Sequence, residues 1–224
     1  MAEVEQGQDL DWRDGTLPVS RRFDDPYFSL QGGLNEARHV FLAGNNLPDR
    51  LCDGFHIAEL GFGTGLNMLA TALEWAATTR PGTVHFTSFE AYPLPGPDIA
   101  RALQAFPEVG TVAQPFLRQW AAGHRQITLP GLRITVITGD ARQTLPAWQG
   151  RADAWFLDGF SPAKNPELWS PRLMAEVAHH TFRAGTFATY TAAGHVRRGL
   201  SEAGFTVTRR PGYARKRHMT TGVL

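Results

Sequence analysis

The sequence feature that most constrains this fold is a glycine-rich turn joining a short apolar strand pattern to a helical pattern. Residues 55–60 are apolar enough for a buried strand, and residues 66–77 carry apolar side chains at helical spacing. The turn between them, residues 61–65, has the sequence Gly-Phe-Gly-Thr-Gly. Glycine lets a backbone approach a ligand where a Cβ atom would clash. The pattern therefore predicts a nucleotide-like ligand at the turn, with a purely structural turn as the alternative.

Strand and helix patterns continue to alternate along the chain. Further strands are predicted at residues 84–90, 132–137, 152–157 and 186–191, and helices at 34–42, 97–106, 112–121, 171–182 and 195–203. Residues 205–209 and 218–223 form a predicted closing hairpin. Such alternation predicts an α/β, Rossmann-like fold with a mostly parallel sheet and a C-terminal antiparallel hairpin strand. Ligands of these sheets bind at the carboxyl ends of the strands.

Size and composition predict one compact core. The chain has 224 residues, of which 42% are hydrophobic. Residues 1–50 are dominated by turn formers, so we expect an irregular N-terminal extension packed on a core of residues 51–224. A lone Cys52, no Cys and His cluster at metal-ligand spacing, and no bilayer-length apolar run predict a cytoplasmic protein without a metal site or a membrane segment.

Charge is unevenly distributed although the net charge is only +1. Acidic residues gather near the N-terminus, whereas basic residues gather in the stretch from 209 to 218. This asymmetry is compatible with a polyanionic partner, and a solvated basic edge explains it equally well.

Acidic residues stand at or near the ends of successive predicted strands. Glu59 precedes the turn, Glu90 ends the second strand, and Asp140 follows the third. S-adenosylmethionine carries a cationic amino group and a ribose diol, which both need anionic or acceptor groups, whereas the third glycine of a dinucleotide loop would fall at Leu66. We therefore predict a cofactor site for S-adenosylmethionine, with simple capping roles for the acids as the alternative. Its predicted residues are Glu59, Gly61, Gly63, Gly65, Asn67, Glu90, Asp140 and Asp158.

The loop after the fourth predicted strand, residues 158–170, combines an acid with prolines and large aromatics. Asp158 is suited to accept a hydrogen bond from an incoming amine, and desolvation there favours the neutral amine. Phe160 and Trp169 are candidates to wall the pocket or stack on a base, and Lys164 to contact phosphate. In the alternative interpretation Asp158 caps the loop, both aromatics belong to the core and Lys164 is solvated.

Three stretches of the chain resemble the methyltransferase domain of the MnmC family: residues 61–67, 156–169 and 189–200. The second of these, Phe-Leu-Asp-Gly-Phe-Ser-Pro-Ala-Lys-Asn-Pro-Glu-Leu-Trp, is the most specific. The likeness extends to residues 25–29, 33–41 and 216–219 and so covers nearly the whole chain. It departs from the family at residues 211–215, which are less glycine-rich, and at His218, where an acid is expected.

This resemblance implies a class I S-adenosylmethionine-dependent methyltransferase that converts 5-aminomethyl-(2-thio)uridine to 5-methylaminomethyl-(2-thio)uridine at the tRNA wobble position. It implies an upstream enzyme that supplies the aminomethyl group, and a stand-alone form without flavin because the chain ends at Leu224. The expected catalytic residues are Asp158, Phe160 and Lys164, and the expected tRNA contacts are Trp169, Arg197, Arg215, Lys216 and Arg217. Alternatives are a small-molecule amine methyltransferase, an aminopropyltransferase and a non-catalytic RNA-binding protein.

Overall fold

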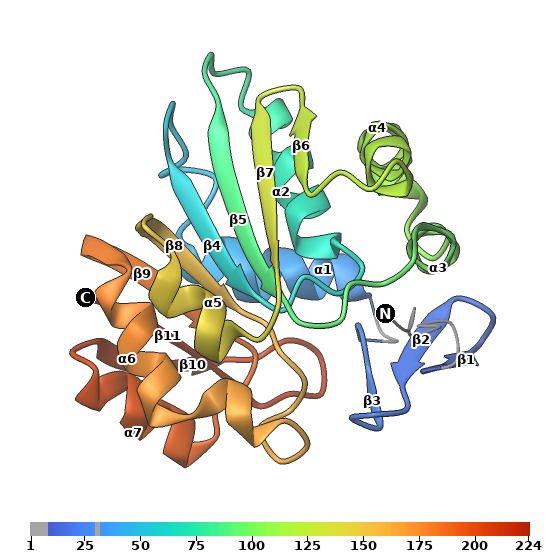
Figure 1. The fold of residues 1–224 in the computed structure, drawn as a ribbon. Helices are drawn as coiled ribbons and strands as arrows, with labels where there is room; N and C mark the ends of the chain where they lie inside the picture. Colours follow the sequence, from blue (N-terminus) through green and yellow to red (C-terminus); the bar gives the residue numbers. More distant parts are fainter. Residues whose placement is uncertain (1–8, 30–31) are drawn as a thin grey trace.

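A computed structural model describes residues 9–29 and 32–224 of the chain. Its centre is an eight-stranded sheet with the strand order β10-β11-β9-β8-β4-β5-β7-β6 (Figure 1). The strands are β4 (His56–Leu60), β5 (Val84–Glu90), β6 (Gln126–Leu129), β7 (Leu132–Thr138), β8 (Ala152–Leu157), β9 (Thr181–Thr189), β10 (Thr206–Pro211) and β11 (His218–Val223).

The five inner strands, from β7 through β5, β4 and β8 to β9, run parallel, so their carboxyl ends share one edge of the sheet. Strands β6, β11 and β10 pair antiparallel at the two sides. The mostly parallel sheet and the closing hairpin predicted from the sequence are confirmed. Parallel strands are covered on both faces, which explains why β8 is apolar at nearly every position.

Helices cover both faces of this sheet. They are α1 (Gly33–Ala37), α2 (Leu66–Ala77), α3 (Gly96–Leu103), α4 (Gly110–Ala121), α5 (Ala141–Ala147), α6 (Pro171–His179) and α7 (Gly194–Glu202). A π-helix η2 (Arg38–Leu42) continues α1, and the 3-10 helices are η3 (Ala43–Asn45), η4 (Pro107–Val109) and η5 (Pro166–Trp169). No helix among residues 9–29 and 32–224 is both long and apolar enough to cross a membrane.

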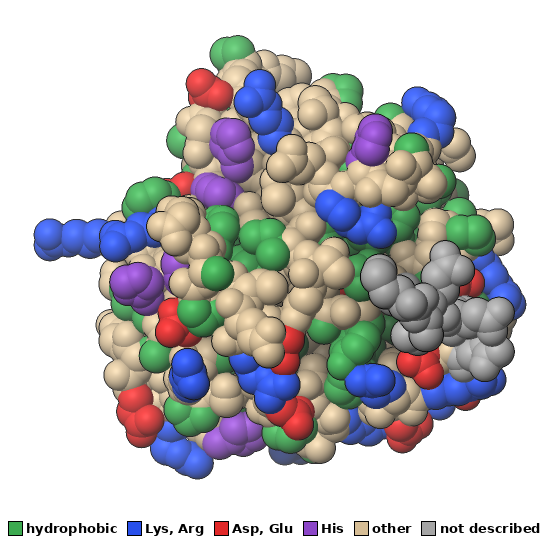
Figure 2. Space-filling view, viewed as in Figure 1, with side chains coloured by type: hydrophobic (Ala, Val, Ile, Leu, Met, Phe, Trp, Pro, Cys, Tyr) green, Lys and Arg blue, Asp and Glu red, His purple; other side chains and the backbone are tan. Residues whose placement is uncertain are grey.

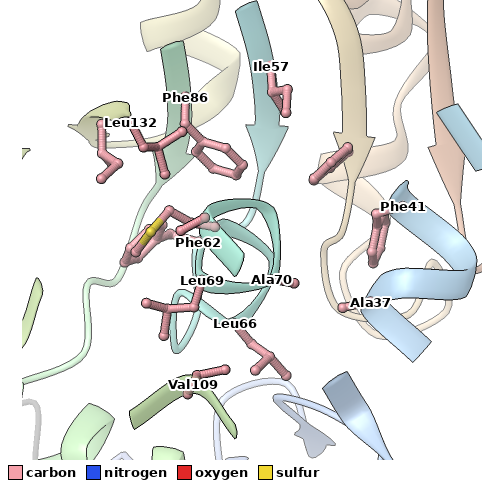
Figure 3. Close-up of a cluster of buried hydrophobic side chains, with 14 of the residues drawn as sticks. Ala37, Phe41, Ile57, Phe62, Leu66, Leu69, Ala70, Phe86, Val109 and Leu132 are labelled. Carbon is pink, nitrogen blue, oxygen red and sulfur yellow. The ribbon is translucent and has the colours of Figure 1, made fainter. Parts of the chain in front are cut away.

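Two hydrophobic clusters lie on opposite faces of the sheet because successive strand residues point to opposite sides. Ile57 and Phe86 belong to the first cluster, with α1, η2, α2 and α4 (Figure 3). Ala58 and Phe89 belong to the second, with α5, α6 and α7. Fully burying one such large side chain contributes about 1.5–3 kcal/mol, so these two clusters fix the sheet that positions the strand ends.

The N-terminal segment is more regular than the sequence indicated. Strands β1 (Leu10–Arg13), β2 (Leu17–Ser20) and β3 (Asp25–Pro26) form a small antiparallel sheet beside α3 (Figure 1). The tight turns between them place Asp14 and Asp24 at positive φ. The prediction that this part of the chain is irregular was wrong, because strands of two to four residues leave no periodic signal.

Several further elements differ from the prediction. The helix expected over residues 171–182 ends at His179, and Phe182 lies in β9 with 44% of its surface exposed. Ser170 is the N-cap as predicted and accepts a hydrogen bond from the Leu173 amide. Strand β6 and helix α5 were not predicted, since one is a four-residue edge strand and the other is a seven-residue helix containing Pro146.

Candidate active site

A cavity of about 850 Å³ opens at the carboxyl ends of the parallel strands. Its volume is that of a small-molecule site, and its position is the one expected for an open α/β sheet. The predicted residues that line it are Gly61, Gly63, Asn67, Glu90, Asp140, Asp158, Phe160, Arg215 and Lys216. Glu59, Gly65, Lys164, Trp169, Arg197 and Arg217 lie outside this lining.

The glycine turn is shaped by the approach of two strand ends. Gly61 has φ +88°, and a Cβ atom there would lie 2.1 Å from the backbone oxygen of Asp158. Gly63 has φ +53°, and its Cβ atom would lie 3.2 Å from the ring of Tyr27. Gly61 is therefore required by the contact between the glycine turn and residues 158–170, the acceptor loop. Gly65 is the N-cap of α2, and a Cβ atom there would lie 3.0 Å from the Phe62 ring.

Asn67, in the first turn of α2, connects two carboxylates. Its side-chain amide donates to Asp158 Oδ2 at 2.7 Å and to Glu59 Oε1 at 2.9 Å. Ser88 Oγ donates to the other Glu59 oxygen at 2.6 Å. Glu59 is fully buried, and burial raises its pKa well above the usual range. This placement corrects the prediction that Glu59 binds the cofactor directly, because its carboxyl group holds Asn67 instead.

Asp158 is half-buried at the end of β8. Burial raises the pKa of its carboxyl to about 7, opposed by the hydrogen bond from Asn67. Nearby Glu36 raises this pKa as well, while Lys216 lowers it. A carboxyl group that titrates near neutral pH can take up a proton from a bound substrate and release it again.

Glu90 and Asp140 both line the cavity, at the ends of β5 and β7. Glu90 accepts hydrogen bonds from the amides of Gly63 at 3.0 Å and Tyr92 at 2.7 Å, which fixes its carboxylate beside the turn. Asp140 caps α5 and forms an ion pair with Arg142 at 2.6 Å, and this hydrogen bonding lowers its pKa. Any ligand contact by Asp140 therefore competes with Arg142.

Aromatic rings from distant segments form one wall of the cavity. Phe160 stacks on Phe23 with ring centroids 4.7 Å apart and meets the edge of Tyr27 at 5.1 Å. The Ser161 amide donates to Asp25 Oδ2 at 2.8 Å, which ties the acceptor loop to the N-terminal segment.

Two predicted residues of the acceptor loop do not face the cavity. Lys164 pairs with Asp24 at 3.0 Å and hydrogen-bonds to its backbone oxygen, so it points away from the cavity lining and its catalytic role stays a prediction. Trp169 is 2% exposed and donates from Nε1 to the Phe160 carbonyl at 2.8 Å. Trp169 therefore braces the loop from the core and cannot stack on a base.

Tyr190 also lines the cavity, together with Phe23, Tyr27 and Glu36, and the last three were not among the residues expected there. Glu36 is buried and pairs with Lys216 at 2.8 Å, and the Tyr190 hydroxyl donates to the Gly159 carbonyl at 2.7 Å. The resemblance includes residues 25–29 and 33–41, which was the available signal for Tyr27 and Glu36.

The predicted tRNA contacts are not gathered in one place. Arg215 and Lys216 line the cavity from the β10–β11 connection, and Arg217 is exposed beside them. Arg197 lies on α7, half-buried, and is not part of the cavity lining; its Nε atom has no hydrogen-bond partner among the described residues. On the face of the molecule that Figure 2 shows, basic side chains are interspersed with acidic ones and form no single continuous basic patch.

The cavity residues fit a cationic, nucleoside-like cofactor. Carboxylates of Glu90 and Asp158 flank the glycine turn, where a ribose diol needs acceptors and a cationic amino acid group needs negative charge. The exposed Tyr92 ring lies beside them. Among the residues that the structure describes, no group of three or more His, Cys, Asp or Glu is arranged to hold a metal ion.

Comparison with known proteins identifies the class. Residues 107–224 match the model of a family described as S-adenosyl-L-methionine-dependent methyltransferase, and the chain belongs to that family. It is similar to the tRNA 5-methylaminomethyl-2-thiouridine biosynthesis bifunctional protein MnmC of Pseudomonas paraeruginosa, with 46% identity over 99% of this chain and 36% of that protein. The protein of the same name from Caulobacter vibrioides is 46% identical over 93% of this chain. The chain thus spans about a third of the length of these relatives.

Solved structures share the fold. The crystal structure of MNMC2 from Aquifex aeolicus matches 96% of this chain and 69% of its own, with a TM-score of 0.76 and 26% identity. A precorrin-6y C5,15-methyltransferase from Geobacter metallireducens matches with a TM-score of 0.52 at 11% identity, which shows the fold alone. The predicted Rossmann-like methyltransferase fold is confirmed.

Proposed function

We propose that this chain methylates the aminomethyl nitrogen of a modified wobble uridine in tRNA. The observation that carries the proposal is the position of Asp158: a half-buried carboxyl at the end of β8, held by Asn67 and walled by Phe160. The names of the curated relatives point to the same reaction, since they refer to biosynthesis of 5-methylaminomethyl-2-thiouridine in tRNA.

The cofactor S-adenosyl-L-methionine supplies an electrophilic methyl group when it is bound. Glu90 is suited to hold its ribose hydroxyls, and Asp158 and the backbone of the glycine turn are suited to hold its amino acid end. Asp140 is suited to the adenine side of the cavity, subject to its pairing with Arg142. A site of this kind accelerates transfer chiefly by aligning the acceptor nitrogen.

Asp158 has the second task of preparing the amine. Its ionised carboxylate accepts a hydrogen bond from the aminomethyl nitrogen, orients the lone pair and takes up the proton released on methylation. Phe160 and Tyr27 exclude water from this part of the cavity, which favours the uncharged amine. Arg215 at the rim is suited to contact tRNA phosphates.

The direct test is methyl transfer to tRNA that carries 5-aminomethyluridine at the wobble position. We expect nucleoside mass spectrometry to show a gain of one methyl group at that uridine, dependent on S-adenosylmethionine. Asp158→Asn tests the role of the carboxylate, because it keeps the size of the side chain and removes the proton acceptor. Transfer at the parent rate by Asp158→Asn would refute the proposed role of this residue.

The same assay separates the alternatives. A small-molecule amine methyltransferase would methylate free amines with little dependence on salt, whereas tRNA binding weakens steeply as salt rises. An aminopropyltransferase would require decarboxylated S-adenosylmethionine as donor. A non-catalytic RNA-binding protein would bind tRNA and transfer nothing in a single-turnover reaction.

The proposed substrate sets the context of the reaction. An upstream tRNA-modifying enzyme must supply the aminomethyl group, and we place the activity in the cytoplasm with its tRNA substrate. We propose that the methyl transfer itself uses neither flavin nor metal, because the nucleophilic nitrogen and the sulfonium methyl group need no redox step.

A further inference from the structure

Lys216 occupies an unusual position for a basic residue near an RNA site. Its Nζ atom lies 2.8 Å from Glu36 Oε1 and 4.3 Å from the centre of the Tyr190 ring. All three side chains line the same cavity as Asp158. The Tyr190 hydroxyl donates to the carbonyl of Gly159, the residue after Asp158, so the ring is fixed relative to the acceptor loop.

A carboxylate and an aromatic face together form a binding site for a primary ammonium group. The carboxylate supplies a charge-assisted hydrogen bond, and the ring face attracts the cation. The aminomethyl group of the proposed substrate is, in its protonated form, the same chemical group as the end of the Lys216 side chain.

The two partners of the ion pair differ in how firmly they are held. The Glu36 side chain is 11% exposed and belongs to α1, which packs into the first hydrophobic cluster. The Lys216 side chain is 45% exposed and comes from the connection between β10 and β11. The carboxylate is therefore the fixed part of the site, and the lysine can leave it by rotating its own side chain into solvent.

We propose that Glu36 and the Tyr190 ring form the entry site for the substrate's ammonium group, and that Lys216 occupies this site until the substrate displaces it. The inference rests on the proposed function, because it takes the acceptor to be a primary amine. It assigns Glu36 to recognition of the amine, next to the carboxylate of Asp158 that orients it for methylation.

Such a resident lysine also provides selectivity. A neutral group of the same size, such as a hydroxymethyl, cannot replace the charge-assisted bond that Glu36 loses when Lys216 leaves. A substrate with a cationic amine therefore replaces the bond that Glu36 loses, and its binding free energy is reduced least. Uridines that lack the amine leave the ion pair between Glu36 and Lys216 intact.

Binding of free nucleosides to the protein saturated with S-adenosylhomocysteine tests this inference without methyl transfer. The probes are 5-aminomethyluridine and its neutral counterpart 5-hydroxymethyluridine, measured by calorimetry. We expect Lys216→Met to bind the aminomethyl probe at least about fivefold more tightly, since the competing occupant is gone. The affinity for the hydroxymethyl probe should not change.

Two further variants define the roles of the partners. Adding Glu36→Gln to Lys216→Met should weaken binding of the aminomethyl probe by about tenfold or more, because the charge-assisted bond is lost. Tyr190→Phe keeps the ring and should keep the preference for the amine. Thermal unfolding of each variant establishes that it is folded. If Lys216→Met binds both probes like the parent, or if the double variant retains the preference, the inference is wrong.

Lysine labelling gives a second readout, because the sequence contains only two lysines, Lys164 and Lys216. Acetylation at Lys216, normalised to Lys164 in the same sample, should rise when 5-aminomethyluridine is bound and stay constant with 5-hydroxymethyluridine. An unchanged or lower ratio with the amine would overturn the displacement of Lys216. Neither the binding assay nor the acetylation assay depends on methyl transfer. The absence of tRNA methylation would therefore refute the proposed function, whereas only these two assays decide whether the amine displaces Lys216.

Discussion

Asn67 Nδ2 lies 2.7 Å from Asp158 Oδ2 and 2.9 Å from Glu59 Oε1, so that one side-chain amide connects carboxyl groups from two neighbouring strands. The connection joins the first turn of α2 to the ends of β4 and β8. It therefore makes the orientation of Asp158 dependent on a residue that sequence alone assigns to the cofactor.

Replacing Asn67 by Ala should lower the methyl transfer rate by about 10- to 100-fold, the cost of one hydrogen bond to a charged group. The pKa of Asp158 should also rise, because the bond from Asn67 lowers it. The pH–rate profile of Asn67→Ala should therefore shift to higher pH. Ser88→Ala, which removes a bond to Glu59 only, should leave the profile in place.

The pH dependence of the parent enzyme follows from the pKa of Asp158, about 7. Below that value the carboxyl is protonated and cannot take up a proton from the amine, so kcat/KM should rise with pH through an inflection near 7. The rate of Asp158→Asn should be lower by about 10²–10⁴-fold and lack this inflection. Persistence of the inflection in the variant would assign it to another group.

The same raised pKa predicts a change in stability with an unambiguous sign. The folded protein binds a proton at Asp158 up to about pH 7, whereas the unfolded chain releases it near the ordinary value of 3.8. Asp158 therefore costs stability as pH rises through this interval. Asp158→Asn should gain more in melting temperature over the parent at pH 8 than at pH 4, as measured by calorimetry. An equal difference at both values would contradict the buried titration.

Gly61 should be much less tolerant of substitution than a glycine with a similar φ angle in open space. In Gly61→Ala the new methyl group meets the Asp158 backbone oxygen, so we expect a loss of about 2–5 kcal/mol of unfolding free energy. Gly54 has φ +78° with no atom within 4 Å of its Cβ position, and Gly54→Ala should cost only about 1–2 kcal/mol. Denaturant titrations of the two variants make the comparison.

Arg215 and Arg217 should contribute to tRNA affinity through phosphate contacts. Replacing both by Ala should weaken tRNA binding and reduce the salt-dependence slope by about 0.7–0.9 for each lost contact. The matched control is Arg151→Ala with Arg183→Ala, two exposed arginines near the amino ends of β8 and β9, at the opposite edge of the sheet. Filter binding at several salt concentrations should separate the pairs, and equal slopes would remove Arg215 and Arg217 from the interface.

The sequence predicts elements well where one local pattern decides them. Helix α2 and strands β5 and β8 have the predicted bounds, because helical spacing and continuous burial are both visible in the sequence. The small N-terminal sheet was missed because its strands are stabilised by pairing with one another and not by a periodic face.

The sequence predicts which strand ends carry the site, but it does not predict in which direction their side chains point. Glu59 lies on the same face of β4 as Ile57, so strand alternation places it under α2, where it bonds to Asn67. That signal was present and unused. The pairing of Lys164 with Asp24 and of Lys216 with Glu36 joins residues 140 and 180 positions apart, which no local pattern encodes.

The bond between the Ser161 amide and Asp25 has a consequence for protein synthesis. A ribosome that has made the glycine turn and its first helix has not yet produced the loop to which the aromatic wall is attached, since the two partners are 136 residues apart. A nascent chain can therefore contain the glycine turn before the acceptor loop is bonded to Asp25. Chains released early should lack methylation activity even where their first strands are already paired.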